Sequence, residues 1–267
     1  MKRTLLTLSI IILFGHINLF AGWIIHEKTI QDVSSAVITE TIMIQDQKMK
    51  TTSEDGTFIF NLKTDELTLV NDRDKVFWTG KIEDFRKEAS EAMKSIVDEL
   101  LEQFPEEQRA ILGNMFDNMT GMYKEPDPDI MNALTVTIEK SGETENIAGF
   151  ESRKYTVEAN GKLVEKVWIS SRPDISSEFD MKELHEALNQ ITPVDAVEDY
   201  YGFDDDYLEL MSSGFVMRTV EPDGTRTEVT EIKETNIDDS EFVPGTDYRK
   251  VDLTEIFRNM MKDDDDK

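Results

Sequence analysis

Apolar and polar residues alternate in many short runs along this chain, a pattern typical of β-strands with one buried face. The most clearly defined pair of runs lies within Thr144–Pro173 and flanks Asn160-Gly161. Asn-Gly tolerates positive φ at both central positions, which a two-residue type I′ turn requires, so this stretch predicts a β-hairpin. The alternating apolar positions are Tyr155 and Val157 before the dipeptide and Leu163, Val167 and Ile169 after it.

Further short runs predict a meander before this hairpin and a second hairpin after it. In Val37–Gln45, the face that carries Ile38, Ile42 and Ile44 also carries Glu40. Strands joined by such short turns pair antiparallel. Lys48–Ser53 is polar, which indicates a strand at the edge of the sheet. Asp223-Gly224 predicts the turn of the second hairpin. The remaining expected strands are Trp23–Ile30, Thr57–Leu62, Leu67–Val70, Val76–Thr79, Ala133–Lys140, Gly214–Val220 and Arg226–Lys233.

The apolar period changes to three or four residues at Ile82, which predicts an amphipathic helix that runs to Phe104. Pro105 can occupy the first turn of a second helix, which carries Ile111, Met115, Phe116, Met119 and Met122. Shorter helices are expected over Asp180–Gln190, within the acidic Pro193–Met211 stretch and from near Asp252. Helices grouped between runs of strands indicate an α+β protein, with one curved antiparallel sheet covered by helices on one face.

The first 21 residues have the composition of a Sec-type signal peptide. Lys2 and Arg3 precede an apolar segment, Leu5–Phe14, and Leu19-Phe20-Ala21 can serve as the cleavage site. The alternative is an uncleaved anchor, but the apolar segment is well short of the ~20 residues that a spanning helix needs. We therefore expect an exported, periplasmic domain over residues 22–262, followed by an acidic tail or tag remnant, Asp263–Lys267.

Charge and cysteine content narrow the class of protein. The formal net charge is −27, and cleavage after Ala21 would change it to −29 by removing Lys2 and Arg3. Nucleic acids and anionic membrane surfaces would repel such a chain, so neither is expected as a partner and membrane contact would be peripheral at most. The chain has no cysteine, which excludes disulfides, thiol catalysis and cysteine zinc sites.

No group of residues in the sequence forms a recognisable catalytic motif. His26 and His185 are far apart in sequence, and no serine lies in a Gly-x-Ser-x-Gly motif. Asp204-Asp205-Asp206 with Glu209 offers oxygen ligands for a cation such as Ca²⁺, but it lacks EF-hand spacing, and a solvated acidic segment is the simpler reading. We expect a non-enzymatic, monomeric protein without a cofactor or metal.

Large apolar side chains are the most informative feature. Methionines are frequent in the expected helices, and methionine suits surfaces that adapt to varied apolar partners. Aromatic residues on a concave sheet beneath such helices could line an apolar ligand pocket. The same residues could equally fill the core between the two layers. The candidate ligand-binding residues are Trp23, Phe58, Phe60, Trp78, Met93, Met115, Met119, Trp168 and Phe215.

Three stretches resemble exported bacterial proteins of the LolA/LolB-like superfamily, the group of outer-membrane lipoprotein-sorting proteins. They are Ile147–Phe150 running into Arg153–Val157, Glu165–Ile169, and Phe242–Tyr248. The resemblance extends over most of residues 23–252. It implies an incomplete antiparallel β-barrel closed by helices and, as in the carrier members, a cavity that holds the acyl chains of lipoproteins. No ligand-binding residue of those carriers matches a position in this chain.

Two functions agree best with these observations, and an enzyme that uses carboxylates is a third alternative, disfavoured because site signatures are missing. The first is a periplasmic binding or carrier-like protein for an apolar ligand such as a lipid acyl chain. The second is a structural or protein-interaction module of the envelope, with a filled core and no ligand. A cavity of several hundred Å³ would favour the first, because ligand pockets usually have volumes of about 300–1,000 Å³.

Overall fold

One open sheet of twelve strands organises the protein. The computed structural model describes residues 22–31, 36–54, 56–106, 108–109, 133–192 and 197–264. The strand order is β12-β6-β5-β4-β3-β2-β1-β11-β10-β9-β8-β7, so β12 and β7 form the two ends of the sheet. The strands are β1 (Gly22–Ile30), β2 (Val37–Gln45), β3 (Lys48–Ser53), β4 (Gly56–Asn61), β5 (Glu66–Asn71), β6 (Val76–Lys81), β7 (Val136–Ile147), β8 (Phe150–Ala159), β9 (Lys162–Ser170), β10 (Phe215–Val220), β11 (Arg226–Thr235) and β12 (Arg249–Lys250).

The sheet consists of two meanders joined at their first and last strands. Short turns connect β1 to β6 in order, and β7 to β9 likewise, with β10 and β11 continuing the second half. Antiparallel pairing of β1 with β11, from Gly22 opposite Thr235 to Ile30 opposite Arg226, joins the halves. Two expectations were wrong: β3 is an interior strand between β2 and β4, and the sheet is mixed because β12 pairs parallel with β6.

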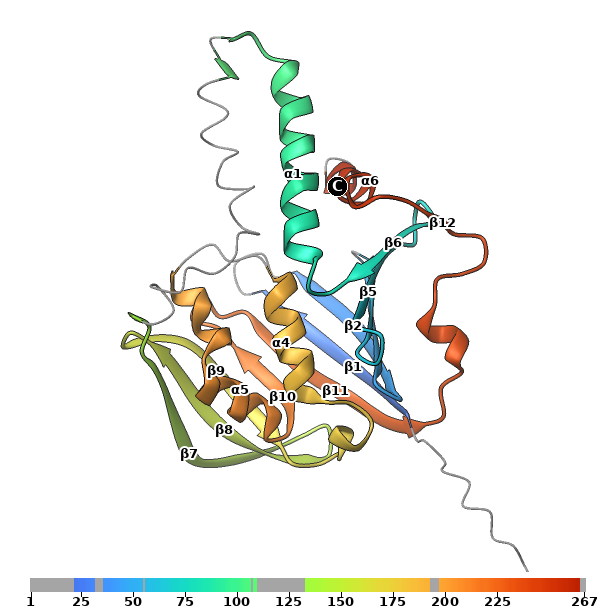
Figure 1. Cartoon of the computed structure of the whole chain (residues 1–267). Helices are drawn as coiled ribbons and strands as arrows, with labels where there is room; N and C mark the ends of the chain where they lie inside the picture. The colour runs from blue at the N-terminus through green and yellow to red at the C-terminus, as the bar shows by residue number, and fades with distance from the viewer. Residues whose placement is uncertain are drawn as a thin grey trace, which may run out of the picture.

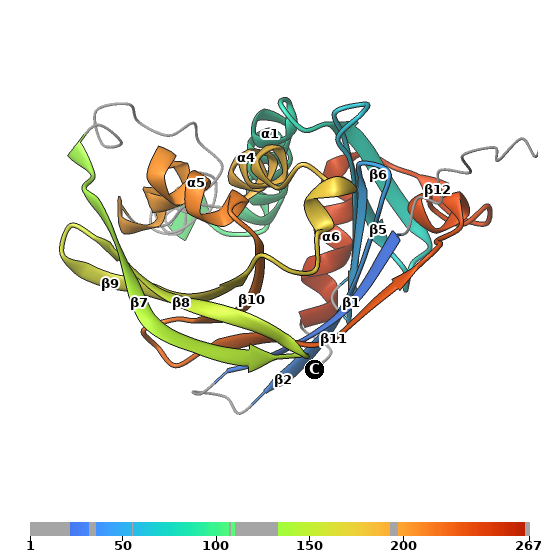
Figure 2. The ribbon, with the colours of Figure 1, turned by 90° about the horizontal axis from the view of Figure 1, so that it is seen from below.

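Helices cover the inner face of the curved sheet, as Figures 1 and 2 show. In Figure 1, α4 and α5 lie side by side over the strands of the second half, while α1 leaves the end of β6 and packs against α6. The confirmed fold class is therefore α+β, with an open curved sheet. The helices are α1 (Phe85–Glu102), α4 (Met181–Ile191), α5 (Asp205–Ser212) and α6 (Leu253–Asp264), with short 3₁₀ turns η1 (Ile175–Ser177), η2 (Val197–Phe203) and η3 (Asp239–Phe242).

Local sequence explains where these helices begin. Asp180 caps α4, because its carboxylate accepts the backbone N–H groups of Lys182 and Glu183, both at 3.0 Å. Asp204 caps α5 in the same way. The helix expected after Pro105 lies outside the described residues. Among the helices that the structure describes, none combines the length and apolar character needed to cross a membrane.

The predicted hairpin at Asn160-Gly161 is confirmed, with φ of 51° and 75° at the two turn residues. Its register differs from strict alternation, however. Val157 lies opposite Glu165 while Glu158 lies opposite Leu163, so Val164 is an extra residue in a β-bulge. The bulge removes Leu163 from the face that Glu165 and Val167 share by their two-residue spacing.

The main core fills the space between the inner face of the sheet and the helices. Its most enclosed side chains are at most 2% exposed and include Ile25, Phe60, Phe179 and Met217. A smaller cluster on the opposite face contains Ile59, Val70, Ile237 and Phe242, so the segment after β11 covers part of the outer face of the sheet. The buried amide of Gln45 fixes this segment through two 2.8 Å hydrogen bonds to the backbone of Ile237.

Candidate functional site

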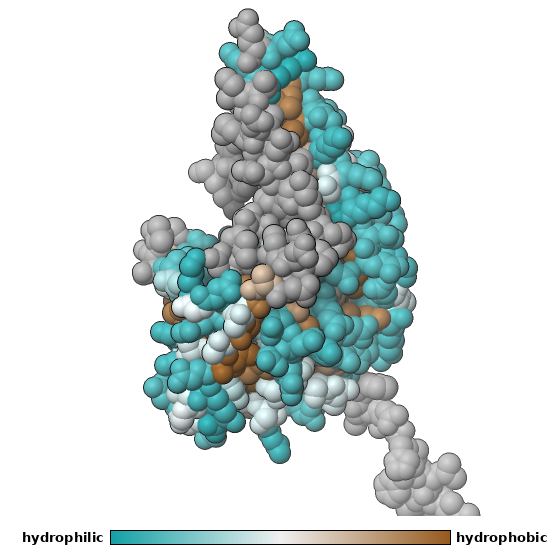
Figure 3. All heavy atoms as spheres, turned by 60° about the vertical axis from the view of Figure 1, so that its left-hand side comes forward, coloured by the Kyte–Doolittle hydropathy of each residue, from teal (hydrophilic) through white to brown (hydrophobic). Residues whose placement is uncertain are grey.

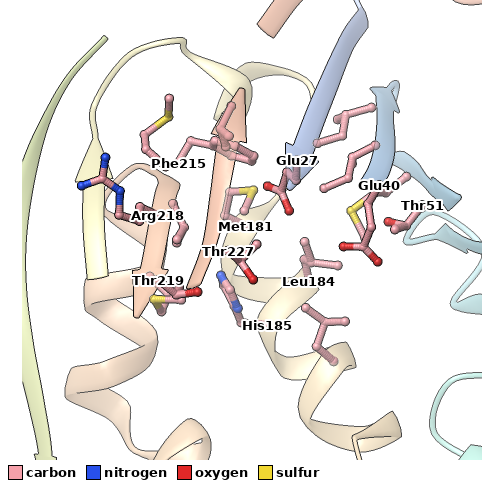
Figure 4. Close-up of a pocket in the computed structure, with 18 of the residues that line it drawn as sticks. Glu27, Glu40, Thr51, Met181, Leu184, His185, Phe215, Arg218, Thr219 and Thr227 are labelled. Atoms are coloured by element: carbon pink, nitrogen blue, oxygen red, sulfur yellow. The ribbon is translucent and has the colours of Figure 1, made fainter. Parts of the chain in front are cut away.

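A pocket of about 310 Å³ lies between the inner face of the sheet and helix α4. Strands β1, β2, β3, β10 and β11 provide one wall, and α4, with Met211 of α5, provides the other (Figure 4). Figure 3 shows an apolar patch bordered by polar side chains in the lower half of one side of the molecule, with smaller apolar areas elsewhere on that side. The apolar lining consists of Ile42, Ile44, Met49, Met181, Leu184, Leu188, Met211, Phe215, Val216, Met217 and Val229.

The period of the strands explains which side chains reach the pocket. Glu40, Ile42 and Ile44 are two residues apart on β2 and therefore share one face. Thr51 pairs with Ile42, so this threonine faces the pocket from β3. On α4, Met181, Leu184 and Leu188 follow the three- and four-residue spacing of one helix face.

A β-bulge in β11 aligns the two central strands. His26 pairs with Glu231, but Glu27 pairs with Val229, so Thr230 is the extra residue. Thr230 is exposed, and its hydroxyl donates a 3.0 Å hydrogen bond to the carbonyl oxygen of His26. The bulge thus places an apolar valine next to Glu27 on the inner face.

Four of the lining residues are methionines: Met49, Met181, Met211 and Met217. Methionine side chains are unbranched and polarizable, so they fit varied apolar shapes. We expected methionines of α1 and of the following helix to form such a surface. In the pocket they come instead from two strands and from α4 and α5.

Two carboxyl groups share this mostly apolar wall. Glu27 of β1 and Glu40 of β2 are direct partners in the strand register, so their side chains lie on the same face. Both are half-buried, and Figure 4 shows both side chains in the pocket. Burial, with a smaller contribution from the charge of Glu40, raises the pKa of Glu27 to about 7. Glu27 is consequently partly protonated near neutral pH.

His185 enters the pocket from α4 and lies near Thr219 and Thr227 in Figure 4. Its Nε2 atom is buried, and no group in the described part of the chain forms a hydrogen bond with it. Burial lowers the pKa of His185 to about 4, so its imidazole is neutral at physiological pH. His185 therefore adds an uncharged polar group to a lining that also contains Glu27, Glu40 and Glu228.

Arg218 also lines the pocket, but its guanidinium is directed away from Glu27 and Glu40. Across the strands, Val229, Glu27 and Glu40 lie opposite one another. The residues next to them along the strands form a second set of partners, in which Glu228 lies between Arg218 and Lys28. Successive residues of a strand point to opposite faces, so the Arg218 guanidinium lies on the other face. Figure 4 shows it pointing away from Glu27 and Glu40.

The structure distributes the sequence-predicted binding residues over several sites. Phe215 is the one among them in the described lining of the pocket. Phe60 and Trp78 are buried in the main core, where the Trp78 ring meets the Phe85 ring edge-on at 5.8 Å, and Trp23 and Phe58 pack against that core. Trp168 lies beneath the guanidinium of Arg218 at 5.0 Å, and Met93 is buried on α1. Met115 and Met119 lie outside the described residues.

Sequence reasoning missed Glu27, His185 and the lining methionines as site residues. A signal was present for the carboxylates, because Glu40 lies in phase with three isoleucines, and Glu27 lies in phase with Ile25 in the same way. The acidic run at Asp204 has a structural role as a helix cap. Among the described residues, no three His, Asp or Glu side chains are grouped closely enough to hold a metal ion.

Known proteins resemble this chain in fold alone. No family model and no curated protein matches it. Solved structures with a similar fold include PNGF-II (TM-score 0.40, 12% identity, 91% of this chain and 33% of that one). Others are the Pseudomonas aeruginosa MucA/MucB complex (0.39, 8%, 86% and 58%) and a putative outer membrane lipoprotein-sorting protein domain from Vibrio parahaemolyticus (0.32, 7%, 84% and 89%).

This chain spans about a third of the PNGF-II chain and just over half of the MucB chain. Similarity at these scores concerns architecture alone, and any functional assignment depends on the pocket itself.

Proposed function

We propose that this protein is a non-enzymatic binding or carrier-like protein of the bacterial envelope, and that its ligand is apolar, such as a lipid acyl chain. The observation that carries the proposal is the pocket of about 310 Å³ beneath α4. Its volume is at the lower end of the range of ligand pockets, about 300–1,000 Å³.

The chemistry of the lining supports an apolar ligand. Burial of a hydrocarbon chain against isoleucine, leucine and methionine gains roughly 0.8 kcal/mol per methylene group. The four lining methionines can adjust to chains of different length or saturation. A carrier benefits from this tolerance, because it must accept and release its ligand without a unique fit.

The half of the molecule that contains β4 to β6 has a filled core. Phe60, Leu67 and Trp78 are each at most 5% exposed, and they pack under α1 and α6. This observation favours the alternative of a structural or interaction module for the half that contains β4 to β6. The pocket beneath α4 favours ligand binding for the other half, and ligand binding is the function that we propose.

The direct test is displacement of a fluorescent apolar probe, N-phenylnaphthylamine, by an alkyl alcohol such as dodecanol. Thr51→Trp would place an indole in the pocket and is expected to reduce probe binding at least about tenfold, equivalent to 1.4 kcal/mol. Thr39→Trp is the matched control, because Thr39 is exposed and lies next to Glu40 in β2, on the opposite face. Unchanged binding in Thr51→Trp, or no probe binding by the parent protein, would contradict the proposal.

Native mass spectrometry of protein purified from its own host provides an independent test. We expect a co-purifying apolar molecule that is released on unfolding. An envelope location requires export by residues 1–21, so the mature protein is expected to begin at Gly22 and to fractionate with the periplasm. A protein that carries residues 1–21 in the cytosolic fraction would contradict this part of the proposal.

A further inference from the structure

The sheet wall of the pocket changes from apolar to polar along its strands. Ile44 of β2 lies opposite Met49 of β3, and Ile42 lies two residues away from Ile44 on the same face. The next residue of that face is Glu40, which lies opposite Glu27 of β1. The described lining is therefore apolar at the end of Ile44 and polar at the end of Glu27.

Strands β10 and β11 extend the polar end of the pocket. Thr219 of β10 lies opposite Thr227 of β11, and both residues line the pocket. The hydroxyl groups of Thr227 and Thr29 share a 2.8 Å hydrogen bond, and Thr29 is two residues beyond Glu27 on β1. Each hydroxyl has one donor and two acceptor sites, so this pair retains acceptor sites beside its mutual bond.

Helix α4 becomes polar in the same direction. It begins at the turn between β2 and β3, where the backbone N–H of Gln47 donates a 2.8 Å hydrogen bond to the carbonyl oxygen of Glu178. Met181, in the first turn of α4, is therefore at the apolar end of the pocket. His185 lies one turn further along α4, and Figure 4 shows it near Thr227. The pocket is thus polarised from one end to the other.

Two groups at the polar end have unused hydrogen-bonding capacity. No described residue forms a hydrogen bond with the carboxyl group of Glu27, and burial is the largest cause that raises its pKa to about 7. The buried Nε2 atom of His185 also has no hydrogen-bond partner among the described residues. Near neutral pH, Glu27 is therefore present in protonated and ionised forms. A buried polar group of this kind is stabilised by a partner that matches it.

We infer that the ligand of this pocket is an amphiphile with an uncharged hydroxyl end group, such as a long-chain alcohol, whose hydroxyl binds the carboxyl group of Glu27 and whose chain extends toward Met49 and Met181. The inference rests on the proposed function, because the chain occupies the apolar lining. A hydroxyl group can accept a hydrogen bond from the protonated carboxyl group and donate one to the carboxylate. An ammonium group cannot accept from the protonated form, and a carboxylate is repelled by the ionised form.

The experiment compares dodecanol with dodecyl methyl ether by displacement of N-phenylnaphthylamine at neutral pH, with each ligand below its solubility limit. The ether has the same chain and the same oxygen position, but it cannot donate a hydrogen bond. It is also the more apolar ligand, so the hydrophobic effect alone would favour it. We expect dodecanol to bind at least about fivefold more tightly than the ether. Monomeric dodecylamine and dodecanoate are each expected to bind more weakly than dodecanol.

Substitutions at Glu27 assign the effect to its carboxyl group. Glu27→Leu removes the hydrogen-bonding group, so the preference for dodecanol over the ether should fall to within about twofold. Glu27→Gln keeps a donor and an acceptor, so it should retain most of the preference. Glu231→Leu is the matched control and should behave as the parent protein. Glu231 is exposed, lies opposite His26 on β11, and is absent from the described lining.

The outcomes separate the two proposals. If dodecanol displaces the probe but binds no more tightly than the ether, or if dodecylamine or dodecanoate binds most tightly, the inference is overturned and the proposed function stands. A preference for dodecanol that survives in Glu27→Leu would also overturn the inference, because the hydroxyl group would then bind elsewhere. If none of the ligands displaces the probe, the proposed function fails, and the inference fails with it.

Discussion

Tyr207 of α5 hydrogen-bonds the carboxyl group of Glu165 on β9, in a site where both side chains are less than 9% exposed. The other oxygen of Glu165, Oε1, is buried and has no hydrogen-bond partner in the part of the chain that the structure describes. Burial is the main cause that raises the pKa of Glu165 to about 7, the charge of Glu221 adds to it, and the Tyr207 hydrogen bond opposes it. This contact ties α5 to the sheet through a carboxyl group that prefers to be protonated.

The raised pKa predicts a pH-dependent stability. In the unfolded chain Glu165 titrates near 4.5, so between about 4.5 and 7 the folded state binds the proton more tightly. The free energy of unfolding contributed by Glu165 is therefore complete below about pH 4.5 and is lost as the pH rises through 7. A shift of this size corresponds to about 3 kcal/mol at most.

Glu165→Gln removes this titration, so the variant should gain stability relative to the parent protein as the pH rises from about 5 to about 8. Denaturant unfolding at the two pH values measures the change, and we expect the variant to gain roughly 2–3 kcal/mol on the parent between them. Glu151→Gln, at an exposed position of β8, is the control and should follow the parent protein. Parallel pH profiles for Glu165→Gln and the parent would show that Glu165 titrates normally.

A second prediction concerns the joint between α1 and α4. The Arg86 side chain is buried, and its Nη2 atom donates hydrogen bonds to the carbonyl oxygens of Asn189 and Thr192, at the C-terminal end of α4. Carbonyl groups at a helix end need partners, and a cation there also favours the helix dipole. Arg86→Met should lower the free energy of unfolding by about 2–4 kcal/mol. Lys87→Met, at the next and exposed position, should change it by less than about 0.5 kcal/mol.

The urea midpoints of the two variants provide the measurement. The prediction would be wrong if Arg86→Met and Lys87→Met had similar midpoints, because the buried hydrogen bonds would then contribute nothing. A smaller slope in Arg86→Met would indicate that α4 separates from the sheet before the remaining structure unfolds.

Local sequence predicted most elements of the fold. Period-2 runs located the strands, the period of three to four residues at Ile82 located α1, and Asn160-Gly161 located a hairpin with positive φ at both turn residues. Long-range pairing was not predictable in this way. The parallel contact of β12 with β6 involves two residues, and a two-residue strand has no period to detect.

The candidate site was harder to predict because bulges change the register. Val164 and Thr230 are extra residues that shift which side chains face inward, and no sequence signal marks them. Aromatic residues were poor guides, since Phe60 and Trp78 close the core whereas aliphatic residues and methionines line the pocket. Charged residues at apolar positions were a better guide to the pocket. Glu27 and Glu40 occupy positions of the period-2 pattern that neighbouring isoleucines also occupy.

The cap of α4 gives a third prediction. Asp180 accepts two backbone N–H groups, and α4 provides one wall of the pocket. Asp180→Ala should lower the free energy of unfolding by about 1 kcal/mol, and Asp180→Asn, which retains an accepting oxygen, by much less. Thermal unfolding of the two variants measures the difference. Equal losses in both would mean that the charge of Asp180, rather than the cap, stabilises the helix.

The last prediction concerns the cation that joins β7, β10 and β11. Arg218 forms two hydrogen bonds with Glu145 and one with Glu228, and its guanidinium stacks on the ring of Trp168 at 5.0 Å. Lysine cannot reproduce a planar fork with several donors, so Arg218→Lys should lower the free energy of unfolding by about 1–3 kcal/mol. It should also alter the fluorescence of Trp168.

Arg249→Lys is a matched control for this substitution. Arg249 also binds a carboxylate, that of Glu255 at 2.6 Å, but its side chain is 64% exposed. Exposed ion pairs contribute about 0–1 kcal/mol, so Arg249→Lys should leave stability nearly unchanged. If both variants lost the same stability, the cost would come from the change of residue type. A loss confined to Arg218→Lys would assign it to the buried contacts, which hold the edge strand β7 to the centre of the sheet.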